Sequence, residues 1–145
     1  MKIIVLDEYG AINSKAEKEK YFIFGGIIYD FDDFEMLKER IVEVMEKIRE
    51  FKNIKEVKSS KICRNHDSTL AFGYLSGMLA SLKEVKTINY VIDKTEASFV
   101  NKYDKISFKY NFILWEMYKE LVDDGLIGSN EEVHILVDEI TFSRF

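Results

Sequence analysis

Short apolar runs separated by polar stretches predict four β-strands along the chain. The first two runs flank the polar link 13–20, and because this link is short we expect the two strands to pair antiparallel. The second run contains Gly25 and Gly26, and glycines inside a strand usually mark a bulge or a close approach of the backbone. The first run is rich in β-branched residues, which is typical of a short strand buried on both faces. The predicted strands comprise residues 3–6, 21–29, 85–93 and 133–138.

Apolar residues that recur every three to four positions predict three helices between these strands. The first helix runs from Asp32 to about Phe51, and Asp32 with Glu35 makes a capping-box-like start. The last helix is strongly amphipathic and stops at Gly125. The expected apolar faces consist of Phe34, Leu37, Ile41, Val44, Met45 and Ile48 in the first helix and Ile106, Tyr110, Ile113, Leu114, Met117 and Leu121 in the last.

The middle helix begins near Asp67 or Ser68. Its Gly73 and Gly77 lie one helical turn apart, which indicates a face packed closely on a neighbour. In the second half of the chain a strand, a helix and a strand follow one another, so we expect a βαβ unit with parallel strands and a right-handed crossover. Together these elements predict an α/β fold with a mixed central sheet of about four to five strands, flanked by helices.

Length, cysteine content and charge narrow the class of protein. The 145 residues predict a single domain, 1–145, that is large enough to bury a core. Cys63 is the only cysteine and no N-terminal segment resembles a signal peptide, so we expect a cytoplasmic protein. The longest apolar runs fall short of the ~20 residues of a membrane-spanning helix, so no membrane segment is expected. The formal charge of −5 argues against a broad surface that coats nucleic acid, but not against a nuclease, because a metal site needs clustered acids.

Three of the predicted strands end in an aspartate, namely Asp7, Asp93 and Asp138. If these strands run parallel, their carboxyl ends share one edge of the sheet, where open α/β folds bind ligands. Neighbouring strands lie ~4.8 Å apart, and carboxylates at that spacing repel one another unless a cation lies among them. Mg²⁺ is such a cation, because it takes one or two carboxylates together with water and substrate phosphate. The alternative interpretation is that each Asp merely starts a loop, since Asp favours turns.

A series of short motifs carries a family resemblance. The opening Leu6-Asp7-Glu8-Tyr9-Gly10 and the strand with Gly25-Gly26 resemble the Asp-Glu-Ser-Gly start and glycine-bearing second strand of the family called domain of unknown function 3800. Glu56-Val57-Lys58 looks like that family's Glu-Leu-Lys motif. Val91-Ile92-Asp93-Lys94 and Val137-Asp138-Glu139 look like its later strand-end acids. The resemblance spans essentially the whole chain.

This resemblance implies an RNase H-like fold and a metal-dependent nuclease active site, often found in phage or mobile elements. On that analogy Asp7 and Asp93 bind Mg²⁺ or Mn²⁺ from adjacent strands, and Glu56 completes the cluster. Lys58 would steady a phosphate of the nucleic acid, and Asp138 is the fourth metal-binding acid. The alternative for Glu56 and Lys58 is a solvated loop, because the stretch around them is rich in charge.

The sequence departs from the family pattern at two places. Tyr9 stands where the family usually has a serine, which alters the turn. Family members continue past the last strand into a helical Ala-Asp motif that supplies another acid, whereas this sequence ends at Phe145. We therefore expect an RNase H-like domain without the family's C-terminal part, whose metal cluster binds weakly or needs a partner chain.

Other residues that could carry chemistry have simpler interpretations. Cys63 and His66 invite a zinc site, yet zinc needs three or four ligands and the chain has one Cys and two His. His134 lies inside an apolar strand, where a buried, hydrogen-bonded histidine is expected. Trp115 recurs with the tyrosines of its helix at helical spacing, so we expect it in the core rather than stacked on a base. Asp123-Asp124 lie at a helix end, where exposure to water is the simplest account.

Three hypotheses about function follow. The first is a divalent-metal-dependent nuclease that hydrolyses phosphodiester bonds in nucleic acid. The second is a non-catalytic module on the same scaffold, which has lost its final acid and recognises a protein or forms a homodimer. The third, a small-molecule phosphohydrolase, ranks last because Asp7 lacks the second acid two residues later that such enzymes generally need.

Overall fold

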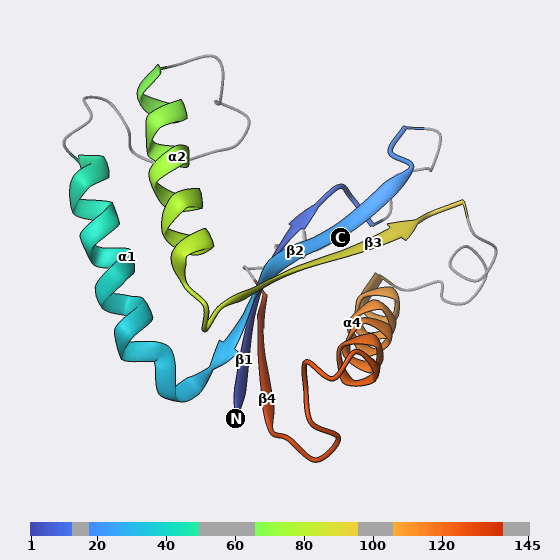
Figure 1. The fold of residues 1–145 in the computed structure, drawn as a ribbon. Helices are drawn as coiled ribbons and strands as arrows, with labels where there is room; N and C mark the ends of the chain where they lie inside the picture. Colours follow the sequence, from blue (N-terminus) through green and yellow to red (C-terminus); the bar gives the residue numbers. More distant parts are fainter. Residues whose placement is uncertain (13–17, 50–65, 96–105, 138–145) are drawn as a thin grey trace. The chain divides into compact units, whose positions relative to one another are not determined.

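The computed structural model describes residues 1–12, 18–49, 66–95 and 106–137. Within them it contains four strands, three α-helices and one 3₁₀ turn (Figure 1). The elements in chain order are β1 (Lys2–Tyr9), β2 (Tyr21–Asp30), η1 (Phe31–Asp33), α1 (Phe34–Arg49), α2 (His66–Ser81), β3 (Lys86–Asp93), α4 (Ile106–Asp123) and β4 (Val133–Val137).

The chain divides into two compact units, which are described separately below. One unit comprises Met1–Ile28 together with Lys86–Phe145 and holds most of the sheet and α4. The other comprises Tyr29–Val85 and holds α1 and α2. None of the described helices is both long and apolar enough to cross a membrane.

The four strands form one mixed sheet in the order β3-β2-β1-β4. β1 and β4 pair in parallel, from Lys2 opposite Val133 to Leu6 opposite Val137. β2 and β3 pair antiparallel along Tyr21–Ile28. The expected α/β class and mixed sheet are therefore confirmed, with four strands among the described residues. β3 and β4 occupy the two edges of the sheet, with β2 and β1 between them.

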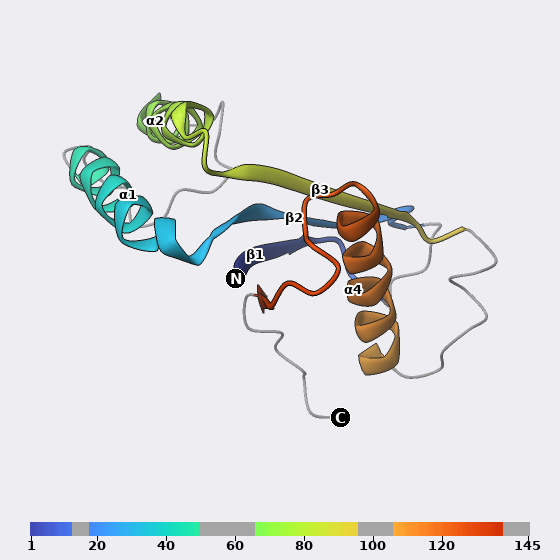
Figure 2. The same cartoon turned by 60° about the horizontal axis from the view of Figure 1, so that its bottom comes forward.

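One face of the sheet packs against α4 and forms the hydrophobic core (Figure 2). Phe22 and Phe24 point to this face and meet Tyr110 of α4 edge-to-face, with ring centroids 5.8 and 5.5 Å away. The predicted apolar face of α4 is confirmed at Tyr110, Ile113, Met117 and Leu121, which are buried at a spacing of three to four residues, and Leu114 is partly buried. The side chain of Ile106 lies outside the described residues. The buried core consists of Ile4, Leu6, Ile12, Phe22, Phe24, Ile28, Ile88, Tyr110, Ile113, Met117, Leu121 and Ile127.

The expectation that β1 is buried on both faces is confirmed only in part, since on the face away from α4 Ile3 is buried. Ile4 and Leu6 contribute to the core beneath α4, but Val5 between them is 37% exposed. The cause is the period-two alternation of a strand, which sends neighbouring side chains to opposite faces. On the face opposite α4, Val91 and Leu136 are also 55% and 54% exposed, so we call this the open face.

The C-terminal end of α4 confirms the predicted stop at Gly125. Gly125 has a positive φ of +71°, which an L-residue rarely adopts. Its N–H donates to the carbonyl of Val122 at 3.0 Å, and the N–H of Leu126 donates to that of Leu121 at 2.9 Å. These two bonds are a Schellman motif, which satisfies carbonyls that the helix end would leave unpaired.

The second unit is a pair of helices that pack through a small apolar cluster. Val44 and Ile48 of α1 meet Ala71 of α2, with Leu75 and Met78 against them. The predicted apolar face of α1 is confirmed only in part, since three of its members are exposed. Those exposed members are Phe34, Ile41 and Met45.

Two local expectations in this unit are corrected. Asp32 does not begin the α-helix, because it lies inside η1 and α1 starts at Phe34. Gly73 and Gly77 do not mark a tight contact, because a Cβ added to either would meet nothing within 4 Å among the described residues.

Candidate active site

An open cleft of about 520 Å³ lies beside Asp7 in the sheet unit. Residues of β1, β2 and β4 line it, and all of them except Asp7 are aliphatic or glycine. This leaves the Asp7 carboxylate as the charged group among the lining residues. The lining residues are Val5, Leu6, Asp7, Gly25, Gly26, Ile27, Leu136 and Val137.

The parallel pair β1–β4 sets the position of Asp7. The register ends with Leu6 opposite Val137, so the residue that follows on each chain segment is an aspartate, Asp7 or Asp138. Asp7 does not follow the end of its strand as expected, because β1 continues to Tyr9. Its side chain is exposed, and Oδ1 accepts the Glu8 N–H at 2.8 Å.

Asp93, at the end of β3, is held by two neighbours. Its Oδ1 accepts hydrogen bonds from the Thr95 hydroxyl at 2.6 Å and the Thr95 N–H at 2.9 Å. Its Oδ2 forms an ion pair with Lys20 Nζ at 2.9 Å. The Thr95 hydroxyl bond, followed by the bond from Lys20, lowers the pKa of Asp93 to about 2. Both oxygens are therefore engaged, which is the geometry of a structural carboxylate.

Asp7 and Asp93 do not project from adjacent strands, contrary to the expectation. β2 lies between β1 and β3, so two interstrand steps separate them, or ~10 Å at ~4.8 Å per step. A single Mg²⁺ with ligands at ~2.1 Å does not bridge that spacing. The structure therefore does not bring these two predicted ligands together around one ion.

The described ends of the β1 and β2 segments, at Ala11 and Glu19, meet at a lysine that the sequence motifs do not indicate as a site residue. Lys94 is buried, and its Nζ donates to the carbonyl of Ala11 at 3.0 Å. Glu19 Oε2 lies 3.8 Å from the same Nζ and accepts the Ala11 N–H at 2.8 Å. In the sequence, the role of Lys94 is indicated only by its position directly after Asp93. Its pairing depends on strand register, which the sequence does not reveal.

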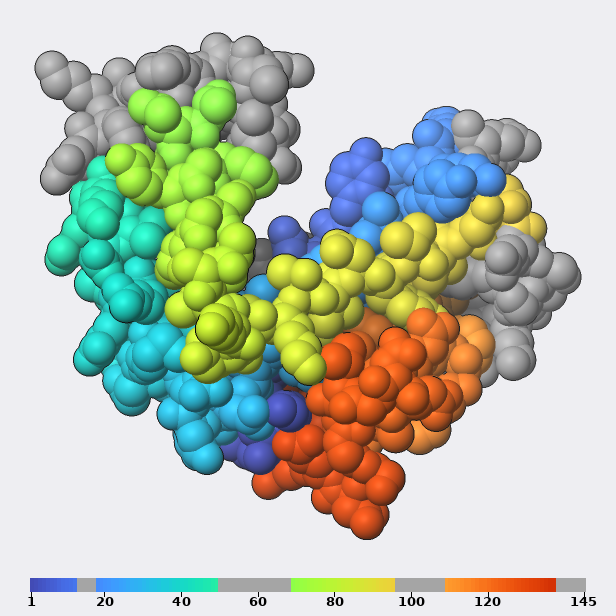
Figure 3. Space-filling view, viewed as in Figure 1, coloured from blue at the N-terminus to red at the C-terminus, as the bar shows by residue number. Residues whose placement is uncertain are grey.

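Tyr90 is a further titratable group, and it lies on β3 where this strand packs against the core residues of α4; β3 is the yellow segment of the space-filling view (Figure 3). Tyr90 is partly buried there, and desolvation, reinforced by Glu120 and Glu116, raises its pKa to about 12. The phenol therefore stays protonated at neutral pH and is not a candidate general base.

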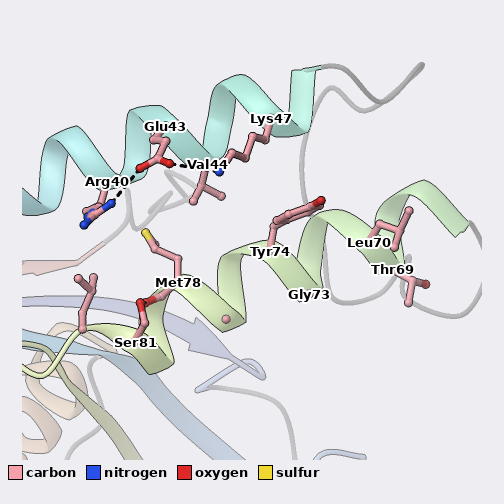
Figure 4. A pocket seen from close by; sticks show the side chains of 12 residues that line it. Arg40, Glu43, Val44, Lys47, Thr69, Leu70, Gly73, Tyr74, Met78 and Ser81 are labelled. Atoms are coloured by element: carbon pink, nitrogen blue, oxygen red, sulfur yellow. Dashed lines mark hydrogen bonds and ion pairs between the residues drawn. The ribbon is translucent and has the colours of Figure 1, made fainter.

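The helical unit has its own groove, of about 640 Å³, between α1 and α2 (Figure 4). Glu43 on its rim forms ion pairs with Arg40 and with Lys47, both at 3.1 Å. The hydrogen bond from Lys47, and then that from Arg40, lower the pKa of Glu43. Glu43 is neutralised by these two cations, and Tyr74 and Met78 lie beside the ion pairs, so the groove offers contact surface rather than a catalytic group.

Two other expectations of burial are wrong. His134 is hydrogen-bonded as expected, with its Nε2 3.0 Å from Glu132 Oε1, but it is not buried, because its side chain is 54% exposed. Trp115 is not in the core, because it is 57% exposed and stacks on Tyr118 with ring centroids 5.8 Å apart. The expected exposure of Asp123-Asp124 is confirmed.

Several predicted site residues lie outside the described residues, namely Glu56, Lys58 and Asp138, and so does Cys63. Within the described ranges, no group of three or more His, Cys, Asp or Glu side chains is arranged to hold a metal. Of the predicted metal ligands, Asp7 and Asp93 lie among the described residues.

The fold and the cleft define an α/β chain with a mixed four-stranded sheet and an aspartate on β1, the inner strand of its parallel pair. No family model, curated protein or solved structure matches the chain. The likeness to the domain of unknown function 3800 family therefore rests on the motifs quoted above.

Proposed function

We propose that this protein is a Mg²⁺- or Mn²⁺-dependent nuclease of the domain of unknown function 3800 type, with an RNase H-like fold and a cytoplasmic location. The observation that carries the proposal is the parallel, in-register pair β1–β4 beside an open cleft. It sets Asp7 at the carboxyl-terminal part of the pair, the region where open α/β sheets bind ligands. In this proposal Asp7 is the central metal ligand, and Asp138 and Glu56 are its partners.

The chemistry of Asp7 suits a hard divalent cation. Mg²⁺ keeps several waters and is bound through one or two carboxylates plus substrate phosphate, so it needs an exposed carboxylate next to open space. Asp7 is exposed and lines the cleft, and the Glu8 N–H donates to its Oδ1. A bound ion would supply Lewis-acid stabilisation of the phosphodiester under attack. Lys58 would add a positive charge for a phosphate.

Asp93 has a different role in this proposal from the one its motif implies. Its bonds to Lys20 and Thr95 support a structural function at the end of β3. We assign it to holding β3 against the start of β2, while Asp7 keeps the metal.

The direct test is a cleavage assay with the full chain. Single- and double-stranded DNA and RNA are incubated with Mg²⁺ or Mn²⁺, and the wild type is compared with Asp7→Ala and Asp33→Ala. Asp33 lies in the short η1 turn and serves as the control for loss of one acid. We expect cleavage by the wild type and Asp33→Ala and at least ~100-fold slower cleavage by Asp7→Ala. Equal rates in all three proteins would refute the proposal.

A non-catalytic interaction module is the second candidate. It is favoured by the exposed apolar side chains Val91 and Leu136 on the open face and by the engagement of Asp93 with Lys20. This module would recognise a protein or a second copy of the chain. An Asp7/Asp93 double alanine variant that retains partner binding or self-association, with no cleavage by the wild type, would favour it over the nuclease.

A further inference from the structure

The two adjacent glycines of β2, Gly25 and Gly26, differ in whether packing requires a glycine at their position. A Cβ on Gly26 would collide with the carbonyl oxygen of Val5 and lie 2.9 Å from Leu6 Cδ2. A Cβ on Gly25 would meet only Asn89 Oδ1, at an ordinary 3.7 Å. Packing within the described chain therefore requires a glycine at position 26 and does not require one at position 25.

Gly25 nevertheless weakens the strand that contains it. A glycine inside a strand loses more conformational entropy than other residues and has no side chain to pack. Where packing does not demand the glycine, the usual remaining reason is that a ligand or another backbone comes close to it.

Gly25 lies on the same face of the sheet as Asp7. Phe24 and Gly26 flank it and point toward the core under α4, so Gly25 faces the opposite, open side. By the same alternation, Leu6 points to the core and Asp7 to the open side. Both Gly25 and Asp7 line the cleft, where Gly25 leaves bare backbone in place of a side chain.

We propose that Gly25 is the floor of a nucleoside subsite, on which the sugar or base of a nucleic-acid strand lies while the adjoining phosphate is at Asp7. This inference rests on the proposed function and names the part of the substrate that the cleft takes. The aliphatic lining from Val5, Ile27 and Leu136 matches the apolar face of a sugar or base. The volume of about 520 Å³ lies within the ~300–1,000 Å³ of small-ligand sites, which suits a nucleoside rather than a folded partner.

The test is to add a side chain at Gly25 and leave the proposed metal ligand Asp7 unchanged. Gly25→Val places a side chain in the cleft, and Gly25→Ala adds a single methyl group at the 3.7 Å contact. Ile23→Val is the matched control, since it changes volume on the same strand outside the cleft lining. The measurements are binding of a labelled single-stranded oligodeoxynucleotide and its RNA counterpart, with and without Mn²⁺, Mn²⁺ binding alone, and thermal unfolding.

We expect Gly25→Val to weaken oligonucleotide binding by at least ~10-fold, with Gly25→Ala between it and the wild type. Mn²⁺ binding and the unfolding temperature should not fall in either variant, and Ile23→Val should match the wild type throughout. If Gly25→Val is too unstable to assay, oligonucleotide binding by Gly25→Ala tests the subsite instead.

The possible results separate this inference from the proposed function. Mn²⁺ binding by the wild type together with unchanged oligonucleotide binding by Gly25→Val overturns the subsite and leaves the metal site standing. A loss of oligonucleotide binding in Gly25→Val without Mn²⁺ binding by any protein supports the subsite and removes the nuclease proposal. A wild type that binds neither oligonucleotide, with or without Mn²⁺, overturns the subsite.

Discussion

The two faces of the sheet use alternate residues of the same strands and differ in how deeply most of their side chains are buried. The face under α4 buries Leu6, Phe22 and Phe24 almost completely and contains the aromatic cluster. The open face carries Asp7 and leaves Val5 partly exposed. The difference teaches that side chains on the first face are needed for packing, whereas those on the second are available for chemistry or contact.

The largest effect should come from removing an aromatic ring on the packed face. Phe24→Ala deletes a fully buried ring that lies 5.0 Å from Phe22 and 5.5 Å from Tyr110. We expect the free energy of unfolding to fall by about 3–5 kcal/mol, measured by urea denaturation. Val5→Ala on the open face should cost less than about 1 kcal/mol. Equal losses would mean that the two faces are packed alike.

The glycine pair gives the next largest contrast. Gly26→Ala places a methyl group against the Val5 carbonyl, so it should destabilise the protein by about 1–3 kcal/mol. Gly25→Ala should instead stabilise it by up to about 1 kcal/mol, because alanine loses less backbone entropy. Urea denaturation of both variants measures this. Similar destabilisation by the two substitutions would show that Gly25 is also required by packing.

A smaller effect is expected from the charges at the end of β3. The pKa of Asp93 is lowered from 3.8 to about 2 on folding, so its contribution to stability is present above about pH 4 and is lost as the pH falls toward 2. Asp93→Asn should therefore flatten the decline of the unfolding temperature between pH 4 and pH 2, and Thr95→Val should do so in part. An unchanged acid profile in both variants would show that these bonds do not form in solution.

The smallest effect should be at an exposed apolar position of the open face. Val91→Thr keeps the β-branched shape on a residue that is 55% exposed, so the unfolding free energy should change by no more than about 0.5 kcal/mol. Thermal unfolding at neutral pH measures it. A loss above about 1.5 kcal/mol would indicate that this position is covered in solution.

Local patterns in the sequence predicted much of this fold. The end of β3 at Asp93, the start of β4 at Val133, the stop at Gly125 and the buried positions of α4 all follow from periodicity and turn chemistry. These features depend on residues within a few positions of one another, which a single sequence contains.

Features that depend on strand order and register could not be predicted from the sequence, because they join residues that are far apart along the chain. The separation of Asp7 from Asp93 follows from the insertion of β2 between their strands. The pairing of Lys20 with Asp93 joins segments that are distant in sequence. The exposure of Trp115 shows a similar limit, because helical spacing of aromatic residues does not say which side of a helix finds a partner.

The central claim is that Asp7 on the open face binds a divalent cation. Its most direct test is a Mn²⁺ titration of the full chain followed by electron paramagnetic resonance, comparing the wild type with Asp7→Asn, which keeps the shape of the side chain, and with Asp33→Asn, an acid of η1. The account predicts Mn²⁺ binding by the wild type and Asp33→Asn, with affinity at least ~10-fold weaker in Asp7→Asn. Equal Mn²⁺ affinity in all three proteins would contradict it.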